Sequence, residues 1–224
     1  AGKTADFVVT GYWSECSLAE ARKYCTPNIA ASGAEMGFTS IPPFSSWRLA
    51  KDAAYVHICS NETLHGVEFG WIPDTRGVPL VANASSNLLS RPLDVSRFGL
   101  IFAAAQKSIG LAGLTLVIVR NDLLGGARAD TPSVFDYTVQ AKADSAYNTL
   151  PTFAVYVSGL TFEWLLAQGG LVAMERANIA KADLLYREID RSGFYVNRVR
   201  REDRSRMNVP FFLREAHLTE PFLR

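Results

Sequence analysis

Residues that build metal sites and disulfide frameworks are scarce in this sequence. Its 224 residues include three histidines and three cysteines, which are Cys16, Cys25 and Cys59. An odd number of cysteines without a CxxC pair argues against a disulfide framework and against a cysteine-based zinc site. We therefore expect reduced thiols, a cytoplasmic location and no bound metal ion.

Long apolar runs and an excess of one charge are also missing. No apolar stretch reaches the ~18 residues that a membrane-spanning helix needs, and the first residues, AGKTADFVVTG, lack the pattern of a signal peptide. Lysine and arginine together number 23, and aspartate and glutamate number 22, which gives a net charge of +1. This balance provides no electrostatic attraction for nucleic acid or for an anionic membrane. We expect neither of them as a partner.

The sequence does contain short apolar segments of the kind that form buried strands. The segments FGLIFAAA (98–105) and LTLVIVR (114–120) are typical of strands that are covered on both faces in a parallel sheet. Helical patterns are interspersed with such segments, and this alternation predicts an α/β fold. The expected strands are 7–13, 54–61, 79–85, 98–105 and 114–120, and the expected helices are 17–25, 151–168 and a further one that ends near residue 191.

Local signals predict where several of these elements begin and end. Ser17 and Glu20 have the spacing of a capping box, which places the start of the first helix at Ser17. Residues 26–47 are rich in Gly, Ser and Pro and predict an irregular excursion. Gly169 is expected to end the helix over 151–168. Residues 207–213 follow a charged turn and predict a strand of a new unit.

Lys107 follows the apolar run 98–105, and Gln106 lies between them. Lysine is almost never fully buried without a partner, and ligands of α/β sheets bind beyond the carboxyl ends of the strands. Lys107 is therefore either an ordinary solvated residue or a lysine whose deprotonated amine attacks an aldehyde to form a Schiff base. Partial desolvation and a nearby cation lower the pKa of such an amine. The spacing alone favours the solvated residue and leaves both interpretations open.

The phrases around Lys107 carry a resemblance to a known family. The stretch SSNLLSRPLDVSRFGLIFAAAQKSIGLAGLTLVIVRNDLL resembles the cofactor-lysine region of phosphoserine aminotransferases, which use pyridoxal phosphate. The resemblance extends, in order, over practically the whole chain. It is carried further by the phrases DFVVTGYWS, HICSNETLHGVEF, TPSVFDY, YNTLPTF, GLTFEWLLAQGGL, NIAKADLLY and RSRMNVPF.

The resemblance implies a fold and a division into domains. The fold is that of the large domain of aspartate aminotransferase, a mostly parallel sheet sandwiched by helices, followed by the start of a smaller α+β domain. On this basis residues 1–192 are expected to form a cofactor-binding large domain that is incomplete at its N-terminus. Residues 193–224 are expected to be the truncated start of the small domain.

The resemblance also assigns roles to individual residues. It makes Lys107 the catalytic lysine that forms the Schiff base with the cofactor, and it makes Gln106 a residue that helps to hold the cofactor phosphate. Trp13 matches a tryptophan that stacks on the pyridine ring, with a buried core aromatic as the alternative interpretation. Thr63 matches a threonine that forms a hydrogen bond with the cofactor hydroxyl.

Asn148 and Thr149 match residues that reach the phosphate of the neighbouring subunit's cofactor. The resemblance therefore implies a homodimer with an active site shared across the interface. From the residues alone, the same pair also fits an Asx-type helix cap before Leu150 and Pro151.

The sequence departs from the family pattern at Asn83. The family has an aspartate at this position, where its carboxylate pairs with the pyridine nitrogen and keeps it protonated. An amide is neutral and cannot supply that ion pair, so the ring becomes a weaker electron sink. Smaller departures are Ala104, Ser108 and Leu150, where the family usually has Gly, Asn and Pro.

Two functions follow from these observations. The first is a transamination in which L-glutamate gives its amino group, through the cofactor, to 3-phosphohydroxypyruvate, which yields 3-phosphoserine and 2-oxoglutarate in serine biosynthesis. The second is a catalytically impaired or inactive truncated homologue that acts as a cofactor-binding or dimerising module, since resemblance in fold does not establish activity. The family phrases favour the first function. Asn83 favours the second, as does the absence from this sequence of the arginines with which the family holds its substrate.

Overall fold

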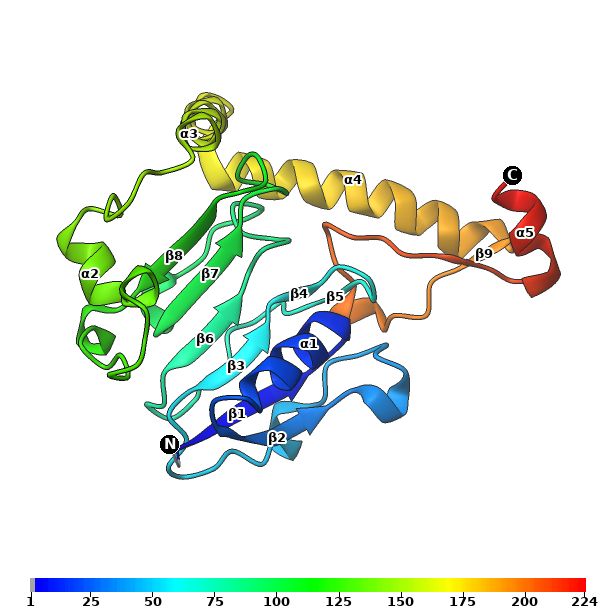
Figure 1. Ribbon diagram of the computed structural model, residues 1–224. Coiled ribbons are helices and arrows are strands. Elements are labelled where there is room, and N and C mark those ends of the chain that lie inside the picture. Colours follow the sequence, from blue (N-terminus) through cyan, green and yellow to red (C-terminus); the bar gives the residue numbers. More distant parts are fainter. Residues whose placement is uncertain (1–2) are drawn as a thin grey trace.

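A six-stranded sheet forms the centre of the protein. The computed structural model describes residues 3–224, and the strands lie in the order β2-β1-β3-β6-β7-β8 (Figure 1). Neighbouring strands from β2 to β7 are parallel, and β8 is antiparallel to β7. The predicted α/β fold with a mostly parallel sheet is confirmed. The strands are β1 (Thr4–Val9), β2 (Thr26–Ser32), β3 (Val56–Cys59), β6 (Leu80–Asn83), β7 (Leu100–Ala104) and β8 (Thr115–Val119).

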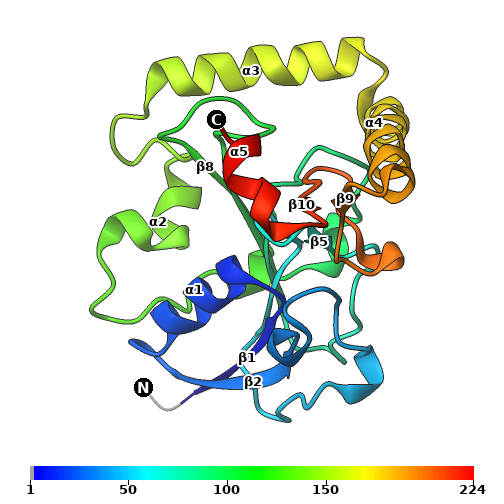
Figure 2. The same cartoon turned by 90° about the vertical axis from the view of Figure 1, so that its right-hand side faces the viewer.

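Helices flank the central sheet, and short two-stranded sheets accompany it. The first helix, α1, contacts β1, whereas the long helix α4 runs toward the C-terminal segment (Figures 1 and 2). No helix described between residues 3 and 224 is long and apolar enough to cross a membrane. The helices are α1 (Tyr12–Ala21), α2 (Tyr137–Lys142), α3 (Thr152–Ala167), α4 (Gly170–Ser192) and α5 (Thr219–Phe222), and the two-residue strands are β4 (Asn61–Glu62), β5 (Val67–Glu68), β9 (Tyr195–Val196) and β10 (Phe212–Leu213).

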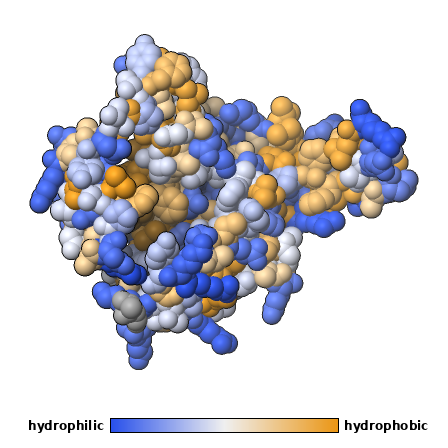
Figure 3. Space-filling view, viewed as in Figure 1, coloured by the Kyte–Doolittle hydropathy of each residue, from blue (hydrophilic) through white to orange (hydrophobic). Residues whose placement is uncertain are grey.

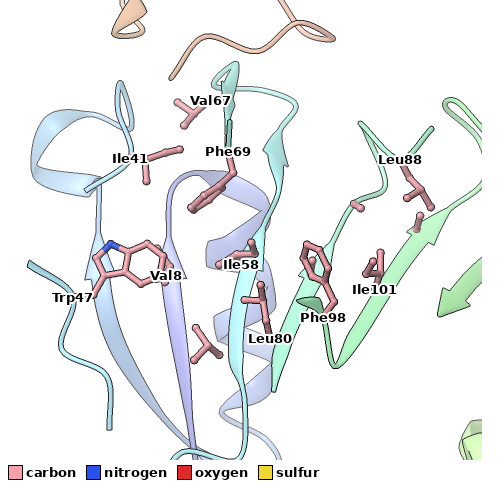
Figure 4. Close-up of a cluster of buried hydrophobic side chains, with 14 of the residues drawn as sticks. Val8, Ile41, Trp47, Ile58, Val67, Phe69, Leu80, Leu88, Phe98 and Ile101 are labelled. Atoms are coloured by element: carbon pink, nitrogen blue, oxygen red, sulfur yellow. The ribbon is translucent and has the colours of Figure 1, made fainter. Parts of the chain in front are cut away.

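The main hydrophobic core lies on one face of the sheet. Successive strand residues point to opposite faces, and the residues that share this face, among them Ile58, Leu80 and Ile101, are buried (Figure 4). Trp47 and Phe69 pack edge to face against each other and close the core from the side of the loops. The β-branched and leucine residues of the apolar runs thus fold into strands because this face buries them.

The opposite face of the sheet carries a buried histidine. The ring of His57 on β3 stacks on Phe7, with ring centres 5.0 Å apart. Burial lowers the pKa of His57 to about 4, and neither ring nitrogen has a hydrogen-bond partner among the described residues. His57 is therefore a neutral core residue. Beside it, an apolar hollow extends over Phe102 toward α1 and the segment before α2 (Figure 3).

The first helix differs from its prediction. It begins at Tyr12 rather than at Ser17, and Gly11 occupies the position before it. The hydroxyl of Ser17 donates a hydrogen bond to the carbonyl of Trp13 within the helix, so Ser17 caps nothing. The capping-box prediction is wrong because the partners that cap this helix come from a distant segment, which is described below.

The two edge strands also differ from their predictions. Residues 26–32 form β2, not an irregular excursion, because they pair in parallel with β1 at the edge of the sheet, where Pro27 is tolerated. β8 is the other edge strand, and its residues are exposed or half-buried rather than covered on both faces. Pairing with β1 explains the first difference and edge position explains the second, and the composition of a segment reveals neither.

The segment after α4 returns to the sheet. The Asp203 carboxylate accepts a hydrogen bond from the N–H of Ile41 at 3.0 Å, and the N–H of Ser205 donates to the carbonyl of Gly66 at 2.8 Å. Within the predicted strand over 207–213, only Phe212–Leu213 is a strand. The division of the chain at residue 192 stays a prediction.

The core on β7 gives a direct test of the fold. Ile101→Ala is expected to lower the free energy of unfolding by about 2–5 kcal/mol, because it leaves a cavity at a side chain that is 1% exposed. Ile118→Ala on β8 is the matched control, and its side chain is 37% exposed, so a clearly smaller loss is expected. Urea denaturation measures both values. Equal losses would contradict the burial of Ile101 in the core, because Ile118 lies opposite it on the same face but at the exposed edge.

Candidate active site

Four parallel strands end at the same edge of the sheet, and predicted site residues follow these ends. Because β1, β3, β6 and β7 are parallel, their carboxyl ends meet where α/β sheets bind ligands. Trp13 follows β1, Thr63 follows β3, Asn83 ends β6 and Lys107 follows β7. The topology therefore gathers residues that are far apart in the sequence.

Lys107 has the surroundings of a site lysine. Its Nζ atom donates a hydrogen bond to the Thr63 hydroxyl at 2.6 Å and lies 6.0 Å from the centre of the Trp13 ring. Partial burial lowers the pKa of Lys107, while Cys59 and Glu62 nearby oppose this change. A lower pKa makes the neutral, nucleophilic amine more abundant at neutral pH. These contacts favour the reactive lysine over the solvated residue.

Trp13 lies in the first turn of α1 with its indole partly open. The residue is 39% exposed, which argues against the alternative of a buried core aromatic. Tyr12 packs edge-on against it, with ring centres 5.1 Å apart. Trp13 therefore presents an aromatic surface next to the Lys107 amine, and such a surface is suited to stacking on a planar ring.

Glu62, which the sequence analysis did not single out, holds the start of α1. Its side chain is fully buried, with Oε2 accepting a hydrogen bond from the N–H of Trp13 and Oε1 one from the N–H of Ser14, both at 2.9 Å. Glu62 lies in the phrase NET directly before Thr63. This phrase led to Thr63, but nothing in it indicates that Glu62 contacts Trp13 and Ser14, which are far away in the sequence.

Asn83 ends β6 with its side chain turned back onto the chain. Its Oδ1 atom accepts hydrogen bonds from the N–H of Ser85 at 3.1 Å and from the Ser85 hydroxyl at 2.7 Å. A backbone N–H can only donate, so this contact identifies Oδ1 as the acceptor. The Nδ2 hydrogens of Asn83 form no hydrogen bond with the described residues and are left for another acceptor.

The remaining predicted site residues are exposed. Gln106 lies in the turn directly before Lys107, and Asn148 and Thr149 lie in the loop that leads into α3. Within residues 3–224, no hydrogen bond joins these three residues to the other predicted site residues. The helix-cap alternative for Asn148 and Thr149 is wrong, because Pro151 is the N-cap residue of α3 and no side chain caps that end.

The chemistry of these groups fits pyridoxal phosphate. Lys107 supplies an amine for the aldehyde, Trp13 supplies an aromatic surface for the ring, and Thr63 supplies a hydroxyl beside the amine. Asn83 adds an amide at the neighbouring strand end, and Gln106 adds an exposed amide in the turn. Each group suits one part of the cofactor.

Comparison with known proteins places the chain in a family. The model of the class-V aminotransferases matches residues 1–224. The phosphoserine aminotransferase of Herminiimonas arsenicoxydans is 57% identical over 220 residues, which are 98% of this chain and 61% of that protein. The chain therefore spans about three fifths of the length of this relative.

Solved structures of similar proteins have the same fold. The phosphoserine aminotransferase from Bacillus circulans subsp. alkalophilus matches with a TM-score of 0.95 and 39% identity, over 99% of this chain and 62% of that one. A pyridoxal-phosphate-bound phosphoserine aminotransferase from Trichomonas vaginalis matches with a TM-score of 0.90 and 40% identity, over 95% of this chain and 60% of that one. The resemblance that the sequence phrases carry is thereby confirmed, and this chain belongs to the class-V aminotransferase family.

Proposed function

We propose that this chain is part of a pyridoxal-phosphate-dependent phosphoserine aminotransferase. The reaction transfers the amino group of L-glutamate to 3-phosphohydroxypyruvate and yields 2-oxoglutarate and 3-phosphoserine, a step of serine biosynthesis. The observation that carries the proposal is the Lys107 amine at a strand end, 2.6 Å from Thr63 Oγ1 and 6.0 Å from the Trp13 ring centre. The 57% identity to a phosphoserine aminotransferase supports the choice of substrates. The activity is proposed for a chain of that relative's length.

Lys107 is the residue that handles the covalent bond and the proton. Pyridoxal phosphate, when bound, supplies an aldehyde that reacts with amines and a conjugated ring that withdraws electrons from the substrate's α-carbon. The neutral Nζ atom of Lys107 is the nucleophile that holds the cofactor, and as a free amine the same atom accepts and returns a proton. Partial burial, which lowers the pKa of Lys107, supports both roles.

Other residues of this chain bind and orient. Trp13 offers its exposed aromatic surface for stacking, Thr63 offers its hydroxyl beside the amine, and Gln106 offers an exposed amide to the phosphate. Each of them lies at the carboxyl edge of the sheet on a separate turn. They fix the position of the ring and leave Lys107 free for the chemistry.

Asn83 is the observation that favours the second function, a cofactor-binding or dimerising module with impaired catalysis. Its free Nδ2 hydrogens suit an unprotonated ring nitrogen, whereas an aspartate would offer a negative oxygen to a protonated one. An unprotonated ring draws electrons less strongly. Losing a charge-assisted hydrogen bond costs about 1.5–3 kcal/mol, or roughly a tenfold to hundredfold loss in rate.

Helix α3 supports a homodimer. Its buried residues form a narrow stripe that faces the protein, and most of the remaining surface is apolar. Monomeric proteins rarely expose a large apolar patch, so a second copy is expected to cover this helix. The loop with Asn148 and Thr149 leads directly into it and thus lies next to the proposed interface. The most exposed apolar residues of α3 are Phe153, Tyr156, Trp164 and Leu166.

The first prediction from the proposed function concerns the attachment site. Borohydride reduction of the pyridoxal-phosphate-loaded protein, followed by peptide mapping, is expected to place the pyridoxyl group on Lys107, because its amine lies beyond a strand end beside Thr63 and Trp13. Lys107→Arg keeps the charge, removes the nucleophile and should abolish the label. Lys181→Arg on the exposed side of α4 is the control and should leave the label unchanged. A label on Lys181, or no label at all, would show that Lys107 is not the attachment site.

A second prediction concerns assembly. Sedimentation at micromolar concentration is expected to show a dimer, and Phe153→Glu on α3 should shift it toward the monomer because a charge enters the apolar interface. Glu163→Gln, an exposed polar position on the same helix, is the control and should remain dimeric. A wild-type monomer would contradict the shared site.

Mixing two defective variants tests whether the site is shared. Lys107→Ala protein and Asn148→Ala/Thr149→Ala protein should each bind the cofactor poorly. An equal mixture, unfolded and refolded together, should recover about a quarter of the wild-type sites, because half of the dimers then hold one intact site. If Asn148 and Thr149 act within their own subunit, the mixture recovers nothing.

A third prediction concerns Asn83. In a chain extended to the length of its relatives, Asn83→Asp is expected to speed the conversion of the cofactor to its amine form with glutamate by about tenfold or more. Cofactor binding should change little, because one carboxylate oxygen still accepts from Ser85. Single-turnover absorbance measures the rate. An unchanged or lower rate in Asn83→Asp would mean that another residue partners the ring nitrogen.

A further inference from the structure

We infer that Glu62 is a positioning residue that sets the place of Trp13 relative to the Lys107 amine, where the cofactor would bind. This inference rests on the function proposed above. The Glu62 side chain is fully buried between the end of β4 and the start of α1. Nothing in the family resemblance assigned it a role, and its action would pass through the backbone of α1 rather than through contact with the reacting atoms.

The carboxylate of Glu62 replaces the missing cap of α1. The first N–H groups of a helix lack partners within the helix and are usually satisfied by the side chain of the N-cap residue. The N-cap residue here is Gly11, which has no side chain. Instead, one Glu62 oxygen accepts a hydrogen bond from the N–H of Trp13 and the other accepts one from the N–H of Ser14, at 2.9 Å each. A negative charge at this helix end is further stabilised by the helix dipole.

The same short turn holds the reactive lysine. Thr63, the next residue, accepts the hydrogen bond from Lys107 Nζ. His65 Nδ1 accepts the N–H of Tyr12 at 3.3 Å, so three successive amides at the start of α1 donate to the turn after β3. The distance between the indole of Trp13 and the amine of Lys107 is therefore set through one segment, residues 62–65, to which both residues are hydrogen-bonded.

Gly11 leaves the space that this arrangement needs. A Cβ atom at Gly11 would lie 2.7 Å from the Glu62 Cδ atom and 2.8 Å from its Oε2 atom, which is closer than real contacts allow. The backbone at Gly11 is extended, with φ 168°, and any residue can adopt it. Glycine is required here by proximity to Glu62. Gly11→Ala consequently displaces the carboxylate without changing its charge.

Two variants and one control distinguish a role of Glu62 in placing Trp13 from a role only in the stability of the fold. Glu62→Gln keeps the shape but turns an amide donor toward one of the two helix amides, which leaves that buried N–H unpaired. Gly11→Ala displaces Glu62 and should have the same effect. Glu68→Gln is the matched control. Glu68 lies on the partner strand of the same hairpin, is buried, and accepts from Asn87 Nδ2 at 3.0 Å and from the N–H of Arg206 at 2.8 Å, but these contacts do not involve α1.

The measurements are made on the full chain with pyridoxal phosphate as the probe. Glu62→Gln and Gly11→Ala are each expected to weaken cofactor binding about tenfold in a tryptophan-fluorescence titration. The double variant should lose little more than either single one, because both act on one contact. Glu68→Gln should lower the unfolding temperature but keep the wild-type affinity.

Hydrogen exchange in the cofactor-free protein provides the second readout. One of the two amides, that of Trp13 or that of Ser14, is expected to exchange at least about tenfold faster in Glu62→Gln, and both should exchange at the wild-type rate in Glu68→Gln. Unchanged exchange in Glu62→Gln, or equal losses of affinity in Glu62→Gln and Glu68→Gln, would overturn the inference. Failure of the wild-type protein to bind the cofactor would instead overturn the proposed function itself.

Discussion

Parallel pairing of β1, β3, β6 and β7 is the constraint on which the candidate site depends. Strands that run in the same direction bring their carboxyl ends to one edge, and the four turns that follow must then lie side by side. Each turn supplies one group, namely the indole of Trp13, the hydroxyl of Thr63, the amide of Asn83 and the amine of Lys107. The antiparallel strand β8 ends this series, because its carboxyl end lies at the opposite edge.

A site made of four turns needs links between them, since turns are more mobile than strands. The structure supplies these links as hydrogen bonds between neighbouring turns. Thr63 is joined to Lys107, and Glu62 is joined to the start of α1. Ser60, at the end of β3, donates through its hydroxyl to Asn87 after β6 at 2.7 Å. Parallel pairing brings the four turns to one edge of the sheet, and these hydrogen bonds hold the turns in place relative to one another.

The sequence predicted those features that depend on local composition or on stretches that resemble the family. Apolar runs marked β3, β6 and β7, and a strand end followed by AQK marked Lys107. Features that depend on distant partners were missed. β2 becomes a strand because β1 pairs with it, and α1 begins at Tyr12 because Glu62 caps it. Neither partner is visible within a short window of sequence.

The charge of the residue at position 83 affects the pKa of Lys107 as well as the cofactor ring. A carboxylate at position 83 would add negative charge at this edge of the sheet, and nearby negative charge raises the pKa of an amine. The neutral amide of Asn83 avoids this, and burial, which lowers the pKa of Lys107, is opposed by Cys59 and then by Glu62. If the function proposed above holds, Asn83 thus favours the neutral amine of Lys107 and at the same time weakens the electron withdrawal that turnover needs.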